Sequence, residues 1–194
     1  MARPREFSEE AALEAATLCF WSRGYEATSI RDLAVTMGIA GASLYNSFGD
    51  KHALFVKVLE RYVERGFDAR VRRLEQDYPP RRAIEMFFAS IIDRSLSDPE
   101  RKGCLVVNSA LEVAPHDSEI QRAIGAALRR VEGFFRRSIE AAQRDGTVSS
   151  ELSADDLARS FLSVLIGIRV LARIRPERKL LEGLLRPVLS LLDA

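Results

Sequence analysis

The sequence predicts an all-α protein with about nine helices. Apolar residues recur every three or four positions along most of the 194 residues, which is the period of a helix buried on one side. Glycine, proline and capping Ser or Asp residues interrupt this pattern at spacings typical of helix boundaries. No stretch of the sequence keeps the alternation of apolar and polar residues that marks a half-buried strand.

The first helix is expected to end at Gly24. Ala12, Ala16, Cys19 and Phe20 form an apolar stripe upstream of it, spaced as one face of a helix. A glycine directly after such a stripe is typical of a helix end, because glycine adopts a positive φ without steric cost.

Two short helices are expected over residues 29–48. A hydroxyl of Thr28-Ser29 can cap the first helix, and Asp32 stands at the distance of a capping box. Gly38 can end that helix in the left-handed conformation, and the second helix then runs from about Ala42. This is the layout of a helix-turn-helix, in which the second helix enters a DNA groove, but an ordinary helical hairpin fits the pattern equally well.

The residues around this motif favour the DNA-binding interpretation. Asp50 can cap a further helix that carries Leu54, Phe55 and Val58. Over its first sixty residues the chain resembles the TetR family of transcriptional regulators, and the rest agrees in length and helical character. The matching residues are Phe20, Gly24-Tyr25, Thr28-Ser29-Ile30, Leu33-Ala34, Gly38-Ile39, Ser43-Leu44-Tyr45, Phe48, Lys51 and Ala53-Leu54.

The resemblance implies two domains and three partners. Residues 1–52 are expected to form the helix-turn-helix DNA-binding domain, and 53–194 the regulatory and dimerisation domain. The implied partners are a double-stranded, palindromic operator, a second copy of the chain and a small-molecule effector that releases the DNA. No cofactor is expected.

The expected DNA contacts lie in the motif and at its edges. Tyr45 and Lys51 match family positions that touch phosphates, and base readout falls to Ser43 and Asn46. Ala40 and Gly41 stand where the family often has a polar capping residue and a lysine. The full expected set is Thr28, Ser29, Arg31, Ala40, Gly41, Ala42, Ser43, Tyr45, Asn46, Ser47 and Lys51.

The charge of the first 51 residues argues moderately against DNA binding. They carry five basic and seven acidic groups, so little affinity is expected from phosphate neutralisation by side chains. Backbone N–H groups at the helix starts near 28–29, 40–42 and 50–51 can bind phosphates instead. Arg3 and Arg5 either add minor-groove contacts or are simply solvated.

Six further helices follow the motif. Pro79-Pro80, Pro99, Pro115 and Pro176 separate most of them, because proline cannot continue a helix, and Gly146 ends the helix over 118–143. The helices are expected over about 51–76, 84–97, 103–112, 118–143, 153–175 and a last segment that ends near 192.

The last two helices each carry a wide apolar face. Two such faces suit a four-helix bundle shared by two chains, although burial within one subunit is the alternative. TetR-like proteins dimerise through their last two helices, so the resemblance favours a homodimer. The expected interface residues are Phe161, Leu165, Ile168, Leu181, Leu184, Leu185 and Val188.

The regulatory domain is expected to contain an effector pocket, as the resemblance implies. Apolar and aromatic residues with few polar groups are typical of such pockets, but each candidate can also be plain core. The candidates are Tyr62, Phe87, Ile91, Cys104, Asn108, Phe134, Phe161 and Leu165.

Cys104 is a candidate sensor of oxidants or electrophiles. It follows Arg101-Lys102-Gly103 at the expected start of a helix, and both features favour the reactive thiolate. Some TetR-like regulators sense through a cysteine in a similar Gly-Cys-Leu segment. The alternative is a small buried apolar side chain.

Other functional classes are weaker. A cysteine enzyme would need Cys104 with His116 and Asp117, but no protease-like signature surrounds the cysteine. A helical dimer that binds a ligand or protein without DNA readout is the third interpretation. Two distant cysteines argue against a disulfide scaffold or a metal site, and the lack of a signal peptide or membrane span suggests the cytoplasm.

Overall fold

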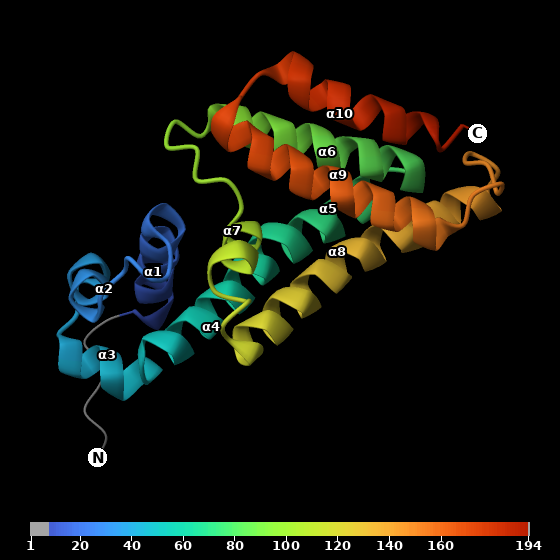
Figure 1. Ribbon diagram of the computed structural model, residues 1–194. Helices are drawn as coiled ribbons and strands as arrows, with labels where there is room; N and C mark the ends of the chain where they lie inside the picture. Colours follow the sequence, from blue (N-terminus) through green and yellow to red (C-terminus); the bar gives the residue numbers. More distant parts are fainter. Residues whose placement is uncertain (1–7, 194) are drawn as a thin grey trace.

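The computed structural model describes residues 8–193, and these residues form helices joined by short turns (Figure 1). The segments Lys51–Tyr62, Val63–Asp68 and Ala69–Asp77 form one continuous helix. Counted in this way, the described residues form nine helices and no strand, which confirms the predicted fold class. Arg3 and Arg5 lie outside the described residues. The elements are α1 (Glu9–Arg23), α2 (Ile30–Met37), α3 (Gly41–Phe48), α4 (Lys51–Tyr62), η1 (Val63–Asp68), α5 (Ala69–Asp77), α6 (Pro80–Ser97), α7 (Leu105–Glu112), α8 (Ser118–Arg144), α9 (Ala154–Ile174) and α10 (Arg178–Ser190).

Two hydrophobic cores organise these helices. The first core contains side chains from α1, α2, α3, α4, α7 and the beginning of α8, such as Phe20, Leu44 and Ile124. The second joins α5, α6, α9 and α10 with the rest of α8. In Figure 1 the long helix α4–η1–α5 and helix α8 extend between the two groups. A displacement of either long helix therefore acts on both cores.

Most of the predicted helix boundaries are confirmed by cap geometry. Asp117 and Ser153 each accept a hydrogen bond from the first turn of the helix that follows, α8 and α9 respectively. Ser8, which was not predicted as a cap, does the same for α1. Pro80 occupies the first position of α6, where its missing N–H costs nothing. No described helix is both long and apolar enough to cross a membrane.

Five phenylalanines fill the centre of the second core. Their ring centroids lie 5.3–5.8 Å apart, and all five side chains are at most 2% exposed. Such aromatic contacts add to the burial of apolar area. The rings belong to α6, α8 and α9 and are Phe87, Phe88, Phe134, Phe135 and Phe161.

Candidate nucleic-acid interface and regulatory cavity

Helix α2 begins with a complete capping box. The Asp32 backbone N–H donates to Ser29 Oγ at 3.1 Å, and the Ser29 N–H donates to the Asp32 carboxylate at 3.0 Å. The Ser29 hydroxyl and then the Ser29 backbone N–H donate to the Asp32 carboxylate, and these hydrogen bonds, followed by the Arg23 guanidinium at 2.8 Å, lower the pKa of Asp32 to about 2. The start of α2 is therefore occupied by a carboxylate of its own.

Gly38 sets the turn between α2 and α3. Its φ of 66° and ψ of 29° are left-handed, and its N–H donates back to carbonyl oxygens in the last turn of α2. A Cβ at this position would meet no atom within 4 Å, so the backbone conformation, rather than space, requires glycine. Leu44 and Phe48 are buried against the first core, which fixes the orientation of α3.

Helix α3 presents its start and one face to solvent. Its N-cap is Ala40, which has no side-chain acceptor, so the first backbone N–H groups of α3 are not capped by a side chain. By contrast, Asp50 caps α4 by accepting from the Ala53 N–H at 2.8 Å. Of the three helix starts predicted to bind phosphates, only that of α3 has no carboxylate at its cap.

The exposed face of α3 carries the predicted polar contacts. Tyr45 is 53% exposed, Asn46 and Ala42 are also exposed, and Ser43 and Ser47 are half-buried. Helix α4 begins directly beside this face. There the Lys51 ammonium lies 4.2 Å from the centroid of the Tyr25 ring, a cation–π distance that orients the lysine.

The DNA-contact prediction for Thr28 is wrong. Its side chain is 0% exposed, and its hydroxyl donates a hydrogen bond to the Gly24 carbonyl oxygen at 2.6 Å. Thr28 therefore ties the end of α1 to the beginning of α2. Ser29 and Arg31, also on the predicted list, are exposed.

A cavity of about 100 Å³ lies between the long helix and α6 to α9. Five of the eight predicted effector residues line it: Tyr62, Phe87, Ile91, Cys104 and Leu165. None of the other lining residues was among the predicted effector residues, because their positions along the helices follow the same pattern as ordinary core or surface residues. These other lining residues include Phe67, Arg70, Arg94, Val107, Val131, Leu162, Ile166 and Arg169.

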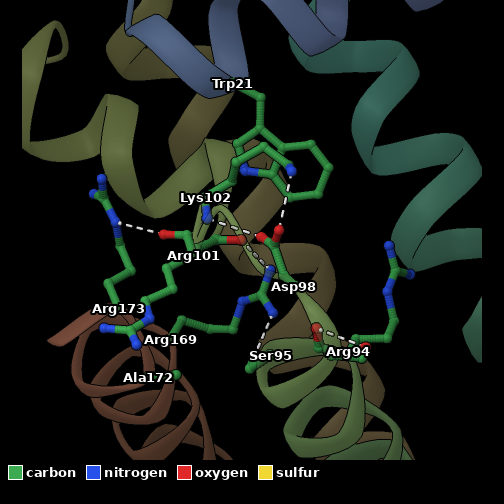
Figure 2. A pocket seen from close by; sticks show the side chains of 11 residues that line it. Trp21, Arg94, Ser95, Asp98, Arg101, Lys102, Arg169, Ala172 and Arg173 are labelled. Carbon is green, nitrogen blue, oxygen red and sulfur yellow. Dashed lines mark hydrogen bonds and ion pairs between the residues drawn. The ribbon is translucent and has the colours of Figure 1, made fainter. Parts of the chain in front are cut away.

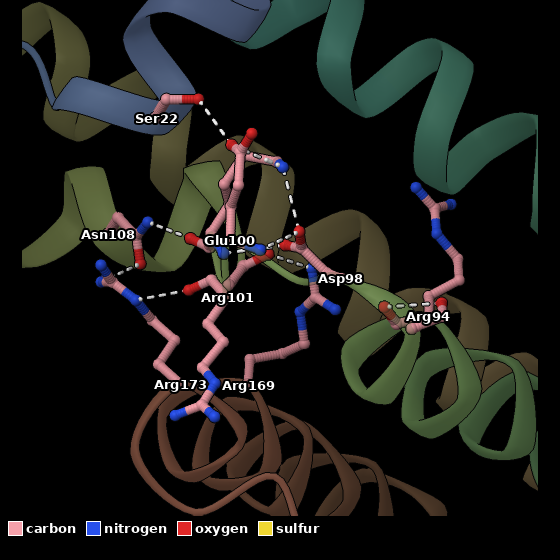
Figure 3. A network of polar contacts seen from close by, with 11 residues as sticks. Ser22, Arg94, Asp98, Glu100, Arg101, Asn108, Arg169 and Arg173 are labelled. Carbon is pink, nitrogen blue, oxygen red and sulfur yellow. Dashed lines mark hydrogen bonds and ion pairs between the residues drawn. The ribbon is translucent and has the colours of Figure 1, made fainter.

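The other three predicted effector residues do not line this cavity. Phe134 and Phe161 are 0% exposed within the aromatic core. Asn108 instead holds a loop: its amide N–H donates to the Lys102 carbonyl oxygen at 2.8 Å, and its amide oxygen accepts from Arg173 at 3.2 Å (Figure 3).

The loop over 98–103 joins the first helix to the second core. Toward α1, Lys102 lies over the Trp21 ring, with the ammonium 5.6 Å from the ring centroid, and the Ser22 hydroxyl donates to Glu100 at 3.4 Å. Toward α9, Arg173 donates to the Arg101 carbonyl oxygen at 3.2 Å, a contact visible in Figure 2. The residues of this loop and its neighbours surround a hollow of about 150 Å³.

Arg169 connects this loop to the cavity. It lines the cavity and is 9% exposed, yet its guanidinium also donates to Ser95 Oγ at 2.9 Å and to the Gly103 carbonyl oxygen. Gly103 has a φ of 74°, and a Cβ there would lie 2.6 Å from Arg173 Cδ. Glycine is thus required both by conformation and by the close approach of α9.

Cys104 lies at the beginning of α7 on the cavity wall. The Tyr62 hydroxyl donates to its Sγ at 3.8 Å, and the side chain is half-buried. Asp117 caps α8 and pairs with His52 Nε2 at 2.8 Å. Among the described residues no hydrogen bond or ion pair joins Cys104 to His116 or Asp117, the contacts on which the enzyme hypothesis depends.

The predicted dimer residues require correction. Phe161, Ile168 and Leu181 are 0% exposed, and Leu165 and Leu185 are below 10% exposed, all within the core of one subunit. Leu184 and Val188 are half-buried and remain accessible in part. The wide apolar faces predicted for the last two helices are thus mostly buried inside the subunit. The exposed apolar side chains of α9 are instead Val170 and Ile174.

The fold and this surface define a helix-turn-helix DNA-binding protein with a second helical domain that encloses a cavity. Comparisons with known families agree. The family model for bacterial regulatory proteins of the tetR family matches residues 12–58, and the model for the tetracyclin repressor-like C-terminal domain matches residues 80–187. The chain belongs to the TetR family and is a DNA-binding transcriptional regulator.

The similarity to known proteins covers most or all of the chain. A Bacillus subtilis (strain 168) protein, the uncharacterized HTH-type transcriptional regulator YezE, is 32% identical over 195 residues, which is 100% of both chains. The HTH-type transcriptional repressor ComR of Escherichia coli (strain K12) is 28% identical over 88% of this chain and 82% of its own. A solved structure of a cysteine mutant of the TetR family regulator CifR, with 26-bp operator DNA, has a TM-score of 0.86 and 31% identity, covering 97% of this chain and 98% of CifR.

Proposed function

We propose that the protein is a homodimeric repressor that binds a palindromic operator through α3 and is released by a small-molecule effector. The observation that carries this proposal is the uncapped, exposed start of α3 held by the left-handed turn at Gly38. A structural relative, CifR, has been solved with operator DNA, and a sequence relative, ComR, is named a repressor.

The contacts on DNA divide into two kinds. Tyr45, Lys51 and the first backbone N–H groups of α3 bind phosphates, which fix the position of the helix on the duplex. Asn46 and Ser43 read base edges in the major groove, where an Asn amide pairs well with adenine. Arg31, exposed on α2, adds a contact at the edge of the site.

The second copy packs on the outward faces of α9 and α10. On α9, Val170 is 36% exposed and Ile174 is 69% exposed. Gly167 lies one turn before Val170, and a Cβ there would meet no atom within 4 Å, so a second helix can approach closely at this point. Leu184 and Val188 extend this surface onto α10. A two-fold axis here is expected to bring two copies of α3 to successive major grooves, which lie roughly 34 Å apart on the duplex.

The effector acts through the loop over 98–103. A molecule in the cavity meets Arg169, whose guanidinium also holds the Gly103 carbonyl oxygen. The same loop contacts α1 through Trp21 and Ser22. A cavity ligand that favours a different position of Arg169 therefore shifts the loop and the DNA-binding helices, provided that it binds the two conformations with unequal affinity.

Cys104 offers a second way to release DNA. Its sulfur lies on the cavity wall in contact with the Tyr62 hydroxyl, so a group added to the sulfur displaces that hydroxyl or fills the cavity. A thiol-reactive molecule would then act on the same loop, because Cys104 directly follows Gly103.

An electrophoretic mobility shift with the DNA upstream of the protein's own gene tests the proposal. The expected result is salt-sensitive binding to a palindromic fragment that an unrelated fragment of equal length does not compete away. Absence of binding at low salt would favour the alternative, a helical ligand- or protein-binding dimer without DNA readout.

A further inference from the structure

The cavity has a chemical feature that its apolar walls do not explain. Three arginines line it, Arg70 on α5, Arg94 on α6 and Arg169 on α9, and its lining contains no Asp or Glu. The remaining walls are mostly aliphatic and aromatic, with Phe67 and Phe87 among them. Three positive charges thus face one small apolar space without a carboxylate to balance them.

The described residues do not neutralise these arginines elsewhere. The Arg70 and Arg94 guanidinium groups form no hydrogen bond or ion pair within residues 8–193, whereas neighbouring arginines such as Arg73 and Arg178 pair with carboxylates. Arg169 bonds only uncharged oxygens, those of Ser95 and Gly103. In Figure 2 the Arg94 side chain extends from α6 toward the teal helix, away from the 98–103 loop.

The charges also interact with one another. Burial, and then the positive charges of Arg94 and Arg169, lower the pKa of Arg70 to about 10. The guanidinium of Arg70 is therefore held in a place that disfavours its own charge. A bound anion would reverse this effect, because opposite charges at short range in a partly desolvated site attract strongly.

We propose that the cavity binds an organic anion: a carboxylate joined to a small aliphatic or aromatic body. The carboxylate lies among the three guanidinium groups, and the body lies against the apolar walls. This inference rests on the proposed effector function of the cavity. It adds the chemical class of the effector, which neither the fold nor the family membership defines.

The volume of the cavity and the chemistry of its arginines indicate the kind of anion that it binds. A volume of about 100 Å³ is several times the roughly 10–15 Å³ that one buried water needs, so the cavity has room for more than a single water. Arginine binds carboxylates through two parallel hydrogen bonds, which gives both affinity and orientation. A short-chain alkanoate or an aryl carboxylate fits both requirements.

Calorimetric titration of the full chain tests this proposal. The probes are the straight-chain carboxylates from butanoate to octanoate and benzoate, each compared with its own primary amide. We expect at least one carboxylate to bind about tenfold or more tightly than its amide, since the amide keeps the body and loses the charge. Equal affinity of every acid and its amide, or no binding by any carboxylate, would overturn the proposal.

Two variants and one matched control locate the site. Arg70→Gln and Arg94→Gln should each weaken carboxylate binding about tenfold, while Arg72→Gln, on the exposed side of the same helix as Arg70, should not. Arg94 is exposed, so its replacement leaves the folded core intact if Arg70→Gln does not fold. Unchanged carboxylate affinity in Arg94→Gln and in a folded Arg70→Gln would contradict the site.

Operator binding without any carboxylate is measured on the same samples. Wild-type protein that binds operator but no carboxylate leaves the proposed DNA-binding function intact and refutes the anion site. Protein that binds a carboxylate with Arg70 dependence but no DNA supports the anion site and refutes the proposed repressor.

Discussion

Arg169, on the wall of the cavity, donates a hydrogen bond to the carbonyl oxygen of Gly103, in the loop that contacts α1. One side chain thus belongs both to the site where an effector would bind and to the segment that supports the DNA-binding helices. The arginine side chain is only 9% exposed, so most of it is shielded from water. We therefore expect a molecule bound in the cavity to affect the position of the loop.

Replacement of Arg169 by methionine should loosen this connection. The variant keeps much of the side-chain volume but leaves the Gly103 carbonyl and Ser95 hydroxyl without their donor, a loss of about 1–3 kcal/mol in unfolding free energy. Amide hydrogen exchange should accelerate over 98–103 and in the last turn of α1. Arg159→Met, on the exposed side of α9, serves as the control, and equal exchange in both variants would contradict the role of Arg169.

Modification of Cys104 should release operator DNA if the thiol is a sensor. An alkylating reagent adds a group where the Tyr62 hydroxyl now contacts the sulfur, so the treated protein should lose affinity for the operator. Cys104→Ser should retain its affinity after the same treatment. Cys19 is buried and acts as an internal control for nonspecific unfolding. Equal responses of wild type and Cys104→Ser would remove the sensor hypothesis.

A charge on the outward face of α9 should separate the two subunits. Ile174→Asp places a carboxylate on a side chain that is 69% exposed in one subunit and is proposed to be buried between two. Light scattering after size-exclusion chromatography should then report a monomer, and operator affinity should fall with it. Leu111→Asp is the matched control, because Leu111 is 74% exposed on α7. A dimer that survives Ile174→Asp would move the interface elsewhere.

The capping box of α2 should make part of the stability depend on pH. The pKa of Asp32 is lowered from 3.8 to about 2 in the folded protein, so its ionised form stabilises the fold. This contribution is complete above its unfolded pKa of about 4 and disappears as the pH falls toward 2. The difference in unfolding temperature between wild type and Asp32→Asn should therefore shrink over that interval, and a difference independent of pH would be inconsistent with the capping box.

The fold was predictable because its signals are local. Capping residues such as Ser29 and Asp117, and glycines such as Gly38, determine helix boundaries through contacts within a few residues, so the sequence alone locates them. The inward faces of the helices follow from periodicity, as the buried Leu44 and Phe48 illustrate.

The partner of each apolar face was not predictable in the same way. Periodicity identifies Phe161 and Leu181 as buried, but it does not distinguish burial within a subunit from burial between two, and the structure places both side chains inside one subunit. The prediction of a DNA contact for Thr28 was wrong for a related reason. A threonine hydroxyl can bind either a phosphate or a backbone carbonyl oxygen, and only the three-dimensional path of the chain shows that it binds the Gly24 carbonyl oxygen here.

The arginines of the cavity had no local signal at all. Arg70, Arg94 and Arg169 stand 24 and 75 residues apart along the chain, on helices whose other arginines pair with carboxylates or face solvent. Their convergence depends on how α5, α6 and α9 pack, which the sequence pattern does not encode residue by residue.

A selection of operator variants from a randomised half-site library tests most directly whether α3 reads the bases. Lys51→Ala should weaken binding to all sequences alike and lower the salt dependence by about one phosphate contact, whereas Asn46→Ala should relax the choice of base at one position in each half-site. An Asn46→Ala protein that selects the same bases as the wild type would contradict the placement of this face of α3 in the major groove.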